Sequence, residues 1–133
     1  MLESGTGQIS PEEQQERVKA SFAKRGLMTT LGATLEGVSP GMVEIVVSPN
    51  PAILQQHGFV HGGVVSAIAD SAAGYAALSL MPADTGALTT EFKITSCTCG
   101  SERILARGRV VKAGRTLALA RAEVFAKTEG QES

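Results

Sequence analysis

The sequence contains no tryptophan, a single tyrosine and four phenylalanines, and only two of its 133 residues are cysteines. The two cysteines, Cys97 and Cys99, are too few for a disulfide framework and lack the spacing of a zinc ribbon. Neither sign of charge dominates, since 12 Lys and Arg balance 13 Asp and Glu. With 43% hydrophobic and 19% charged residues, the composition excludes a disordered or collagen-like chain and indicates one globular domain.

The chain also lacks the long apolar run expected of a membrane span. The nearest approach is residues 64–81, but Asp70 lies near its middle, between Ser66 and Ser71. This run is rich in alanine, which favours a helix buried inside the protein. The amino terminus has no basic region followed by an apolar stretch, so we expect no secretory signal, a cytoplasmic protein and no membrane partner.

Charge is unevenly distributed along the chain. Residues 1–92 carry 4 basic and 9 acidic side chains, whereas residues 93–127 carry 8 basic and 2 acidic ones. The cationic segment contains almost no aromatic residues, and the whole chain is not basic, which argues against nucleic acid as a partner. A small polyanionic ligand fits this segment better.

Hydrophobic periodicity predicts an α+β fold without internal repeats. Ser10 and Glu13 form a capping box for a helix over about 11–25, and Gly26 is its expected stop. The pattern then predicts strands at 31–38 and 42–48, a loop at 52–63 with one helical turn, the long helix, and strands at about 87–98, 103–113 and 116–127. The result is an antiparallel sheet of about five strands wrapped around one central helix, with residues 1–26 as an arm and short helix and 27–133 as the main domain. Alanines on one side of the last strand, Ala118, Ala120, Ala122 and Ala126, are small enough for the helix to approach closely.

The densest chemistry lies in residues 55–63 and at Asp70. Glycines 62 and 63 allow a ligand to come close to the backbone, and the first amides of a helix are unpaired donors at its positive end. A carbonyl oxygen would be polarised there. Asp70 follows about two turns later on the same face, and an acid on an apolar helix is costly unless it is paired or used. Asp70 is therefore the first candidate for a functional residue, against the alternative of an aspartate bonded to nearby backbone.

Other residues near this glycine turn and Asp70 are weaker candidates. His57 and His61 are four residues apart, but the glycines around them favour a loop, and no third metal ligand is evident, so we expect no metal. His61 either anchors the loop through a hydrogen bond or orients the site. Cys97 and Cys99 are interpreted as ordinary reduced thiols.

The stretch from Gln55 to Asp70, read as Gln-x-x-Gly-x-x-His-Gly-Gly followed seven residues later by Asp, resembles the signature of hotdog-fold acyl-CoA thioesterases of the phenylacetate-pathway (PaaI-like) group. Residues 89–94 and 108–116 are similar to the later strands of that group, and the likeness spans about residues 40–127. The resemblance implies a hotdog fold, hydrolysis of acyl-CoA without a cofactor, and a homodimer or homotetramer with active sites at the dimer interface.

Carried over residue by residue, the resemblance makes Asp70 the carboxylate that activates water or attacks the thioester. The backbone amide of Gly62 becomes the donor that polarises the carbonyl, with His61 supporting its loop. Thr89 falls where the group often has a Ser or Thr that helps to hold the water. Gln55 is a departure, because the group frequently has Asn there. A second departure is residues 96–99, where members often carry an apolar stretch ending in proline.

Coenzyme A carries a 3′-phosphate and a pyrophosphate, which would give the cationic segment a purpose. Arg115, with Lys112 and Arg109 nearby, could contact these phosphates, the alternative being a solvated hairpin tip. Gly63 and His57 complete the residues expected to bind substrate.

Two other functions stay open at this level. A hotdog hydratase or dehydratase would use His61 or His57 with Asp70 as acid and base. A non-catalytic acyl-CoA-binding module would use neither. The identity of the acyl chain is not encoded in a pattern that the sequence reveals.

Overall fold

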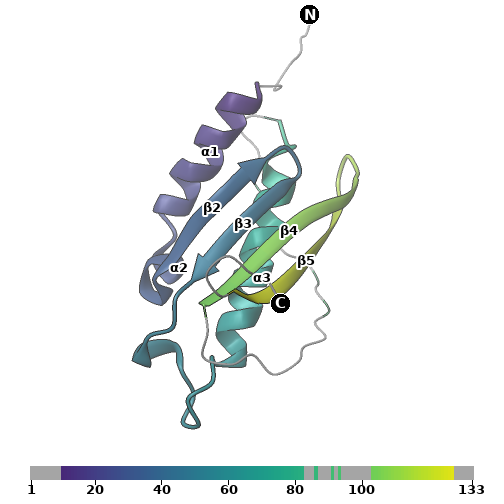
Figure 1. Cartoon of the computed structure of the whole chain (residues 1–133). Helices are drawn as coiled ribbons and strands as arrows, with labels where there is room; N and C mark the ends of the chain where they lie inside the picture. Colours follow the sequence, from purple (N-terminus) through teal and green to yellow (C-terminus); the bar gives the residue numbers. More distant parts are fainter. Residues whose placement is uncertain (1–9, 83–85, 87–90, 92, 94–102, 128–133) are drawn as a thin grey trace, which may run out of the picture.

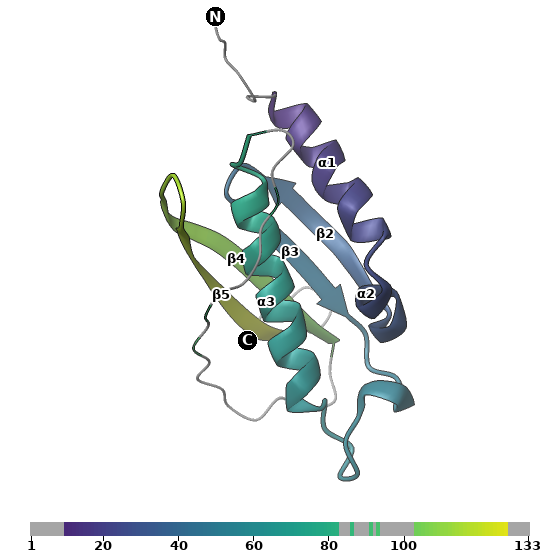
Figure 2. The ribbon, with the colours of Figure 1, turned by 180° about the vertical axis from the view of Figure 1, so that it is seen from behind.

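The computed structural model describes residues 10–82, 86, 91, 93 and 103–127. They form three helices, a short 3-10 turn and four strands: α1 (Pro11–Ala23), α2 (Gly26–Leu31), β2 (Ala33–Ser39), β3 (Met42–Val47), η1 (Pro51–Ile53), α3 (Gly62–Leu78), β4 (Arg103–Ala113) and β5 (Ala118–Lys127). The strands make one antiparallel sheet in the order β2-β3-β4-β5. The helix α3 runs diagonally across one face of this sheet, as Figures 1 and 2 show from opposite sides. This is the predicted α+β arrangement, and the expected strand at 87–98 lies, apart from residues 91 and 93, outside the described residues.

The core lies between α3 and the sheet. Alternate residues of β3 and β4 face the helix, and they meet the apolar side of α3. The fully buried members of this layer are Val43, Ile45, Val47, Ile104, Ala106, Ile68 and Ala72. Burying such side chains contributes about 1.5–3 kcal/mol each to folding, so this layer fixes where α3 sits.

Gly108 sets the distance between helix and sheet. A Cβ atom at this position of β4 would lie 2.3 Å from the backbone carbon and oxygen of Ala72. The prediction of a close approach was correct, but the contact is made through β4 as well as through the alanines of β5. Ala120, Ala122 and Ala126 are half-buried, whereas Ala118 is exposed and lines a cavity near the end of α3.

The amino-terminal segment corrects two sequence predictions. The capping box at Ser10 and Glu13 is present, and the backbone and hydroxyl of Ser10 hold the pKa of the Glu13 carboxyl below its usual value. The helix, however, ends at Ala23, and Gly26 begins the second helix α2 instead of stopping the first. Gly32, with a φ of 72°, ends α2, so β2 starts at Ala33 and not at 31.

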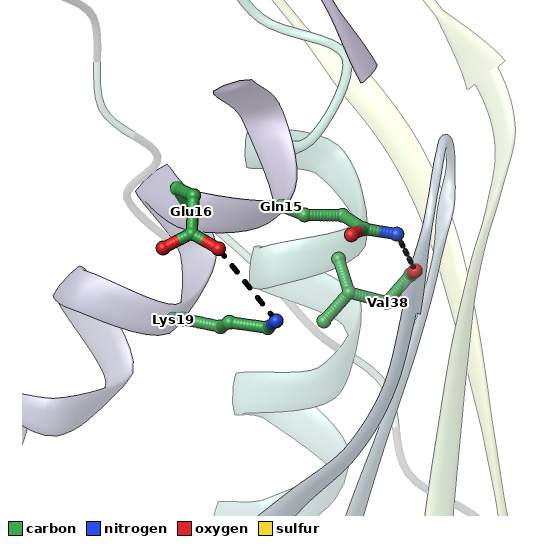
Figure 3. A network of polar contacts seen from close by, with 4 residues as sticks. All are labelled: Gln15, Glu16, Lys19 and Val38. Atoms are coloured by element: carbon green, nitrogen blue, oxygen red, sulfur yellow. Dashed lines mark hydrogen bonds and ion pairs between the residues drawn. The ribbon is translucent and has the colours of Figure 1, made fainter. Parts of the chain in front are cut away.

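The helix α1 lies along β2 and beside α3 (Figures 1 and 2). Gln15 donates its side-chain amide to the carbonyl oxygen of Val38 at 2.9 Å, while Glu16 and Lys19 form an exposed ion pair at 3.7 Å (Figure 3). Exposed pairs of this kind contribute little to stability. The docking of α1 therefore depends on buried contacts such as that of Val18, which is fully buried.

None of the described helices combines the length and apolar character that crossing a membrane requires.

Candidate active site

The loop before α3 is shaped by Gln55. Its side-chain oxygen accepts hydrogen bonds from the backbone N–H groups of His57 and Phe59, and its own backbone N–H donates to the carbonyl of Phe59 at 2.7 Å. Gly58, with a φ of 86°, supplies the left-handed conformation that this tight turn requires. The side-chain oxygen of Gln55 is thus used within the loop. No acceptor among the described residues takes the hydrogens of the side-chain NH₂ group, which can donate to a ligand. His57 is exposed at the tip.

His61 caps the first turn of α3. Its Nδ1 atom accepts a hydrogen bond from the backbone N–H of Gly63 at 2.8 Å, and its carbonyl accepts from Val64 at 2.9 Å. Of the two alternatives for His61, the geometry supports the anchoring hydrogen bond. This bond also assigns the proton of the neutral ring to Nε2.

The cap distinguishes the two glycines that follow it. The N–H of Gly63 is occupied by His61, so it is not a free donor for a ligand. Among the described residues, no acceptor pairs with the N–H of Gly62, which lies exposed at the positive end of α3. A Cβ atom on Gly62 would meet nothing within 4 Å, so the space beside its Cα atom is open. Gly62 is therefore the residue of the loop that can polarise a carbonyl oxygen.

Asp70 lies at the centre of α3 and is half-buried. Helical periodicity places it on the side of α3 that faces away from the sheet, together with Ser66 and Ala73, which are also half-buried. This side is made of small residues, and Gly74 adds a position where a Cβ atom would meet nothing within 4 Å. The surface of α3 around this carboxylate is therefore formed by small side chains, which a bound molecule or a second protein surface could approach closely.

A cavity of about 250 Å³ lies at the opposite end of α3, between its last turn and the β4–β5 hairpin. Arg115 and Thr116 contribute its polar groups, and apolar lining comes from Leu80, Val110 and Leu117. Arg109 does not join them, because Gly108 and Val110 face the α3 side and the strand alternation turns Arg109 to the outer side of the sheet. Lys112 is exposed and pairs in register with Leu119. The structure therefore separates Arg109 from Arg115, and neither Arg109 nor Lys112 lines the cavity.

Two polar side chains at α3 were missed by the sequence analysis. Gln14 is only 8% exposed and donates its amide to the carbonyl of Met81 at 2.8 Å. Arg25 donates to the hydroxyl of Ser71 at 3.2 Å, next to Asp70. Gln14 could have been noticed as a polar residue on the same helical face as Val18, whereas nothing in the spacing marks Arg25. Thr89, Cys97 and Cys99 lie outside the described residues.

Comparison with known proteins identifies the family. The sequence profile of the thioesterase superfamily matches residues 57–133, more than half of the chain. This chain belongs to the thioesterase superfamily. A superfamily relative from Deinococcus radiodurans, named "Putative esterase", is 33% identical over 101 residues, which cover 76% of this chain and 68% of that protein.

Solved structures agree with the superfamily assignment. A thioesterase family protein from Silicibacter pomeroyi is 44% identical and superimposes with a TM-score of 0.84, covering 90% of this chain and 88% of that one. The Escherichia coli PaaI protein from the phenylacetic acid degradation operon shares the fold, with a TM-score of 0.81 at 18% identity over 92% of this chain and 87% of that one. The hotdog thioesterase fold inferred from the Gln55–Asp70 motif is confirmed.

Proposed function

We propose that this protein hydrolyses acyl-CoA thioesters to a carboxylic acid and CoA, with Asp70 as general base or nucleophile and the Gly62 amide as the polarising donor. The observation that carries the proposal is the exposed Gly62 N–H, which lacks a partner among the described residues at the start of a helix whose outward side presents Asp70. A donor aimed at a developing oxyanion typically contributes 10²–10³ in kcat.

The proposed hydrolysis uses only the thioester and water as reactants. In the general-base version, Asp70 takes a proton from water, whose oxygen attacks the thioester carbonyl carbon. The carbonyl oxygen gains negative charge opposite the Gly62 N–H, which stabilises it. The C–S bond then breaks, and the thiolate of CoA takes up a proton. Gln55 supports this arrangement, since its amide NH₂ is the group of its side chain left to donate to the water or to the carbonyl.

The spacing along α3 supports a site that is shared between two copies. Gly62 and Asp70 are eight residues apart, which corresponds to about 12 Å along a helix, and the Gly62 N–H points away from Asp70 toward the amino-terminal end. One thioester cannot contact both groups of one helix. If two α3 helices pack antiparallel through their small-residue sides, the Gly62 of each copy comes close to the Asp70 of the other.

The arrangement of cations supports CoA as the leaving group. The cavity that contains Arg115 begins at Ala77 and Leu80, about 10 to 15 Å along α3 from Asp70. An extended pantetheine arm spans such a separation, so a nucleotide phosphate could meet Arg115 while the thioester lies at Asp70. The hydratase alternative is less favoured, because Nδ1 of His61 is already occupied by the helix cap.

Release of free thiol from a panel of aryl-, short- and medium-chain acyl-CoAs tests the proposal. Hydrolysis liberates CoA thiol, hydration changes only the acyl chain, and a binding module does neither. Thiol release above the background rate with at least one class is the expected result. Its absence from the whole panel, with acyl-CoA binding retained, would contradict the proposal.

The shared site also predicts a homodimer or homotetramer. Sedimentation at micromolar concentration should show a species at least twice the 13.7 kDa mass of the chain. A stable monomer with full activity would overturn the shared site.

A further inference from the structure

Arg25, at the junction of α1 and α2, is held in a fixed orientation although it is exposed. Its Nη2 atom donates to the hydroxyl of Ser71 at 3.2 Å, and its guanidinium carbon lies 5.4 Å from the centre of the Tyr75 ring. Tyr75 is 3% exposed and is itself fixed by the hydroxyl of Ser21 at 3.1 Å and by the ring of Phe22 at 6.0 Å. The cation thus rests on a rigid aromatic platform.

No carboxylate neutralises this cation within the described part of the chain. The ion pairs there join Lys19 to Glu16, Arg103 to Glu36 and Arg107 to Glu44. A guanidinium has five N–H donors, and the bond to Ser71 uses one of them. The remaining donors form a planar fork, which matches the geometry of a carboxylate or a phosphate.

The position of Arg25 connects it with the candidate active site. Ser71 follows Asp70 directly, so Arg25 contacts α3 at the residue next to the proposed catalytic carboxylate. Helical periodicity places Ala67 and Gly74 on the surface between these two side chains. Both are small and half-buried, and a Cβ atom on Gly74 would meet nothing within 4 Å. The small side chains therefore leave room for a narrow bound molecule to extend from Asp70 to Arg25, beside the surface through which two α3 helices would pair.

We propose that Arg25 binds an oxyanion of the substrate, with Ser71 and Tyr75 as its positioning residues. The inference rests on the proposed function, because it takes the ligand to be a thioester bound at Asp70. The oxyanion has two sources in such a ligand: a carboxylate at the far end of the acyl group, or a phosphate of CoA.

Four matched ligands separate these sources. Glutaryl-CoA carries both kinds of anion, pentanoyl-CoA only the phosphates, glutaryl-pantetheine only the carboxylate, and pentanoyl-pantetheine neither. Binding is measured by calorimetry in the Asp70→Asn background, where the thioester stays intact. We expect Arg25→Ala to weaken binding about tenfold wherever the recognised anion is present, the scale of one charge-assisted hydrogen bond to an exposed group.

The pattern of loss decides the outcome. A loss confined to the two glutaryl ligands assigns the acyl carboxylate, and a loss confined to the two CoA ligands assigns a phosphate; either supports the proposal. An equal loss with all four ligands, including pentanoyl-pantetheine, would mean that Arg25 only ties α1 to α3. No loss with any of them would also overturn the inference.

Two further variants serve as controls. Lys24→Ala removes the neighbouring exposed cation and should leave all four affinities unchanged, because the Lys24 side chain is exposed and has no polar contact with the described residues of α3. Arg25→Lys keeps the charge but loses the planar fork, so its losses should be smaller and follow the same ligands, even if Arg25→Ala folds poorly. Thiol release by the wild-type protein is scored separately. A protein that binds with this pattern but releases no thiol would refute the thioesterase proposal and leave the oxyanion site standing.

Discussion

The two ends of α3 are held in different ways. At the carboxyl end, distant segments hold the backbone: Gln14 and Arg17 from α1 donate to the carbonyl of Met81 at 2.8 and 3.0 Å, and the N–H of Gly41 donates to the hydroxyl of Ser79 at 2.8 Å. At the amino end, the contacts are local. His61 caps Gly63 two residues away, and the bonds of Gln55 to other described residues stay within its own turn.

This contrast indicates that the carboxyl end of α3 serves stability and the amino end serves binding or catalysis. The last carbonyls of α3 are satisfied locally by Ser79, Leu80 and Met81, whereas the long-range bonds just beyond the helix fix its carboxyl end against α1 and the β2–β3 turn. At the amino end, the first N–H has no partner among the described residues and lies exposed, where water or a ligand can accept its hydrogen bond. Changes at the amino end and at Asp70 should therefore affect turnover, whereas changes at the carboxyl end should affect stability.

Asp70→Asn is expected to have the largest effect. The substitution keeps the size and hydrogen-bonding ability of the side chain but removes the base or nucleophile, so turnover should fall by about 10² to 10⁴. The melting temperature should change little, because Asp70 is half-buried on the side of α3 away from the sheet. Thiol release and thermal unfolding measured on the same preparation check both statements. Near-wild-type turnover would remove Asp70 from the mechanism.

Gly62→Pro should have the next largest effect. Proline is tolerated at the first position of a helix, and His61 already has the extended conformation (φ −60°, ψ 134°) that a residue before proline adopts. The variant therefore removes one N–H and preserves the fold, and kcat should fall by about 10² if that N–H polarises the carbonyl.

Gly62→Ala is the matched control for this prediction. It adds a methyl group but keeps the N–H, and the added Cβ atom would meet nothing within 4 Å. We expect kcat near that of the wild type and unchanged or slightly higher stability. If Gly62→Ala loses as much activity as Gly62→Pro, steric exclusion of the substrate explains the loss and the Gly62 amide has no demonstrated role.

The sequence revealed the amino end of α3 better than the carboxyl end. The motif from Gln55 to Asp70 is contiguous, and its contacts are local, so spacing and helix-capping rules were sufficient to find it. The bond from Gln14 to Met81 joins residues 67 positions apart and depends on how α1 docks. No periodicity within either segment encodes such a contact.

The same limit explains why the sequence did not indicate the end of the first helix or the faces on which the cations lie. Gly26 follows Lys24 and Arg25 as a stop signal would, but the chain turns into α2 there, and the buried side chains of Met28 and Leu31 stabilise the new helix. Tertiary packing outweighed the local propensity of glycine. Arg109 and Arg115 are both basic and close in sequence, yet strand alternation and the hairpin turn send them to different faces.

Gln14→Ala tests the anchored end. The substitution removes a nearly buried hydrogen bond, while Arg17 still donates to the Met81 carbonyl, so the free energy of unfolding should fall by about 1–2 kcal/mol. Denaturant unfolding measures the loss, and kcat should stay within about twofold of the wild type. Lys19→Ala is the control on the same helix, because its ion pair at 3.7 Å is exposed and should contribute almost nothing. A tenfold loss of kcat in Gln14→Ala without unfolding would show that the two ends of α3 are coupled.

Arg115→Ala should have the smallest effect and tests whether the carboxyl end of α3 also takes part in binding. If Arg115 meets a CoA phosphate above the cavity, its loss should raise KM for acyl-CoA about tenfold and leave kcat nearly unchanged. The phosphate is remote from the thioester and is bound similarly in the ground and transition states, which is why the effect falls on KM.

Added salt should weaken wild-type binding more than binding by the variant, since screening acts on the attraction that the mutation removes. An acyl-pantetheine substrate lacks the nucleotide and should not distinguish the two proteins. An equal loss with both substrates would place Arg115 in the folding of the hairpin, and the carboxyl end of α3 would then be structural throughout.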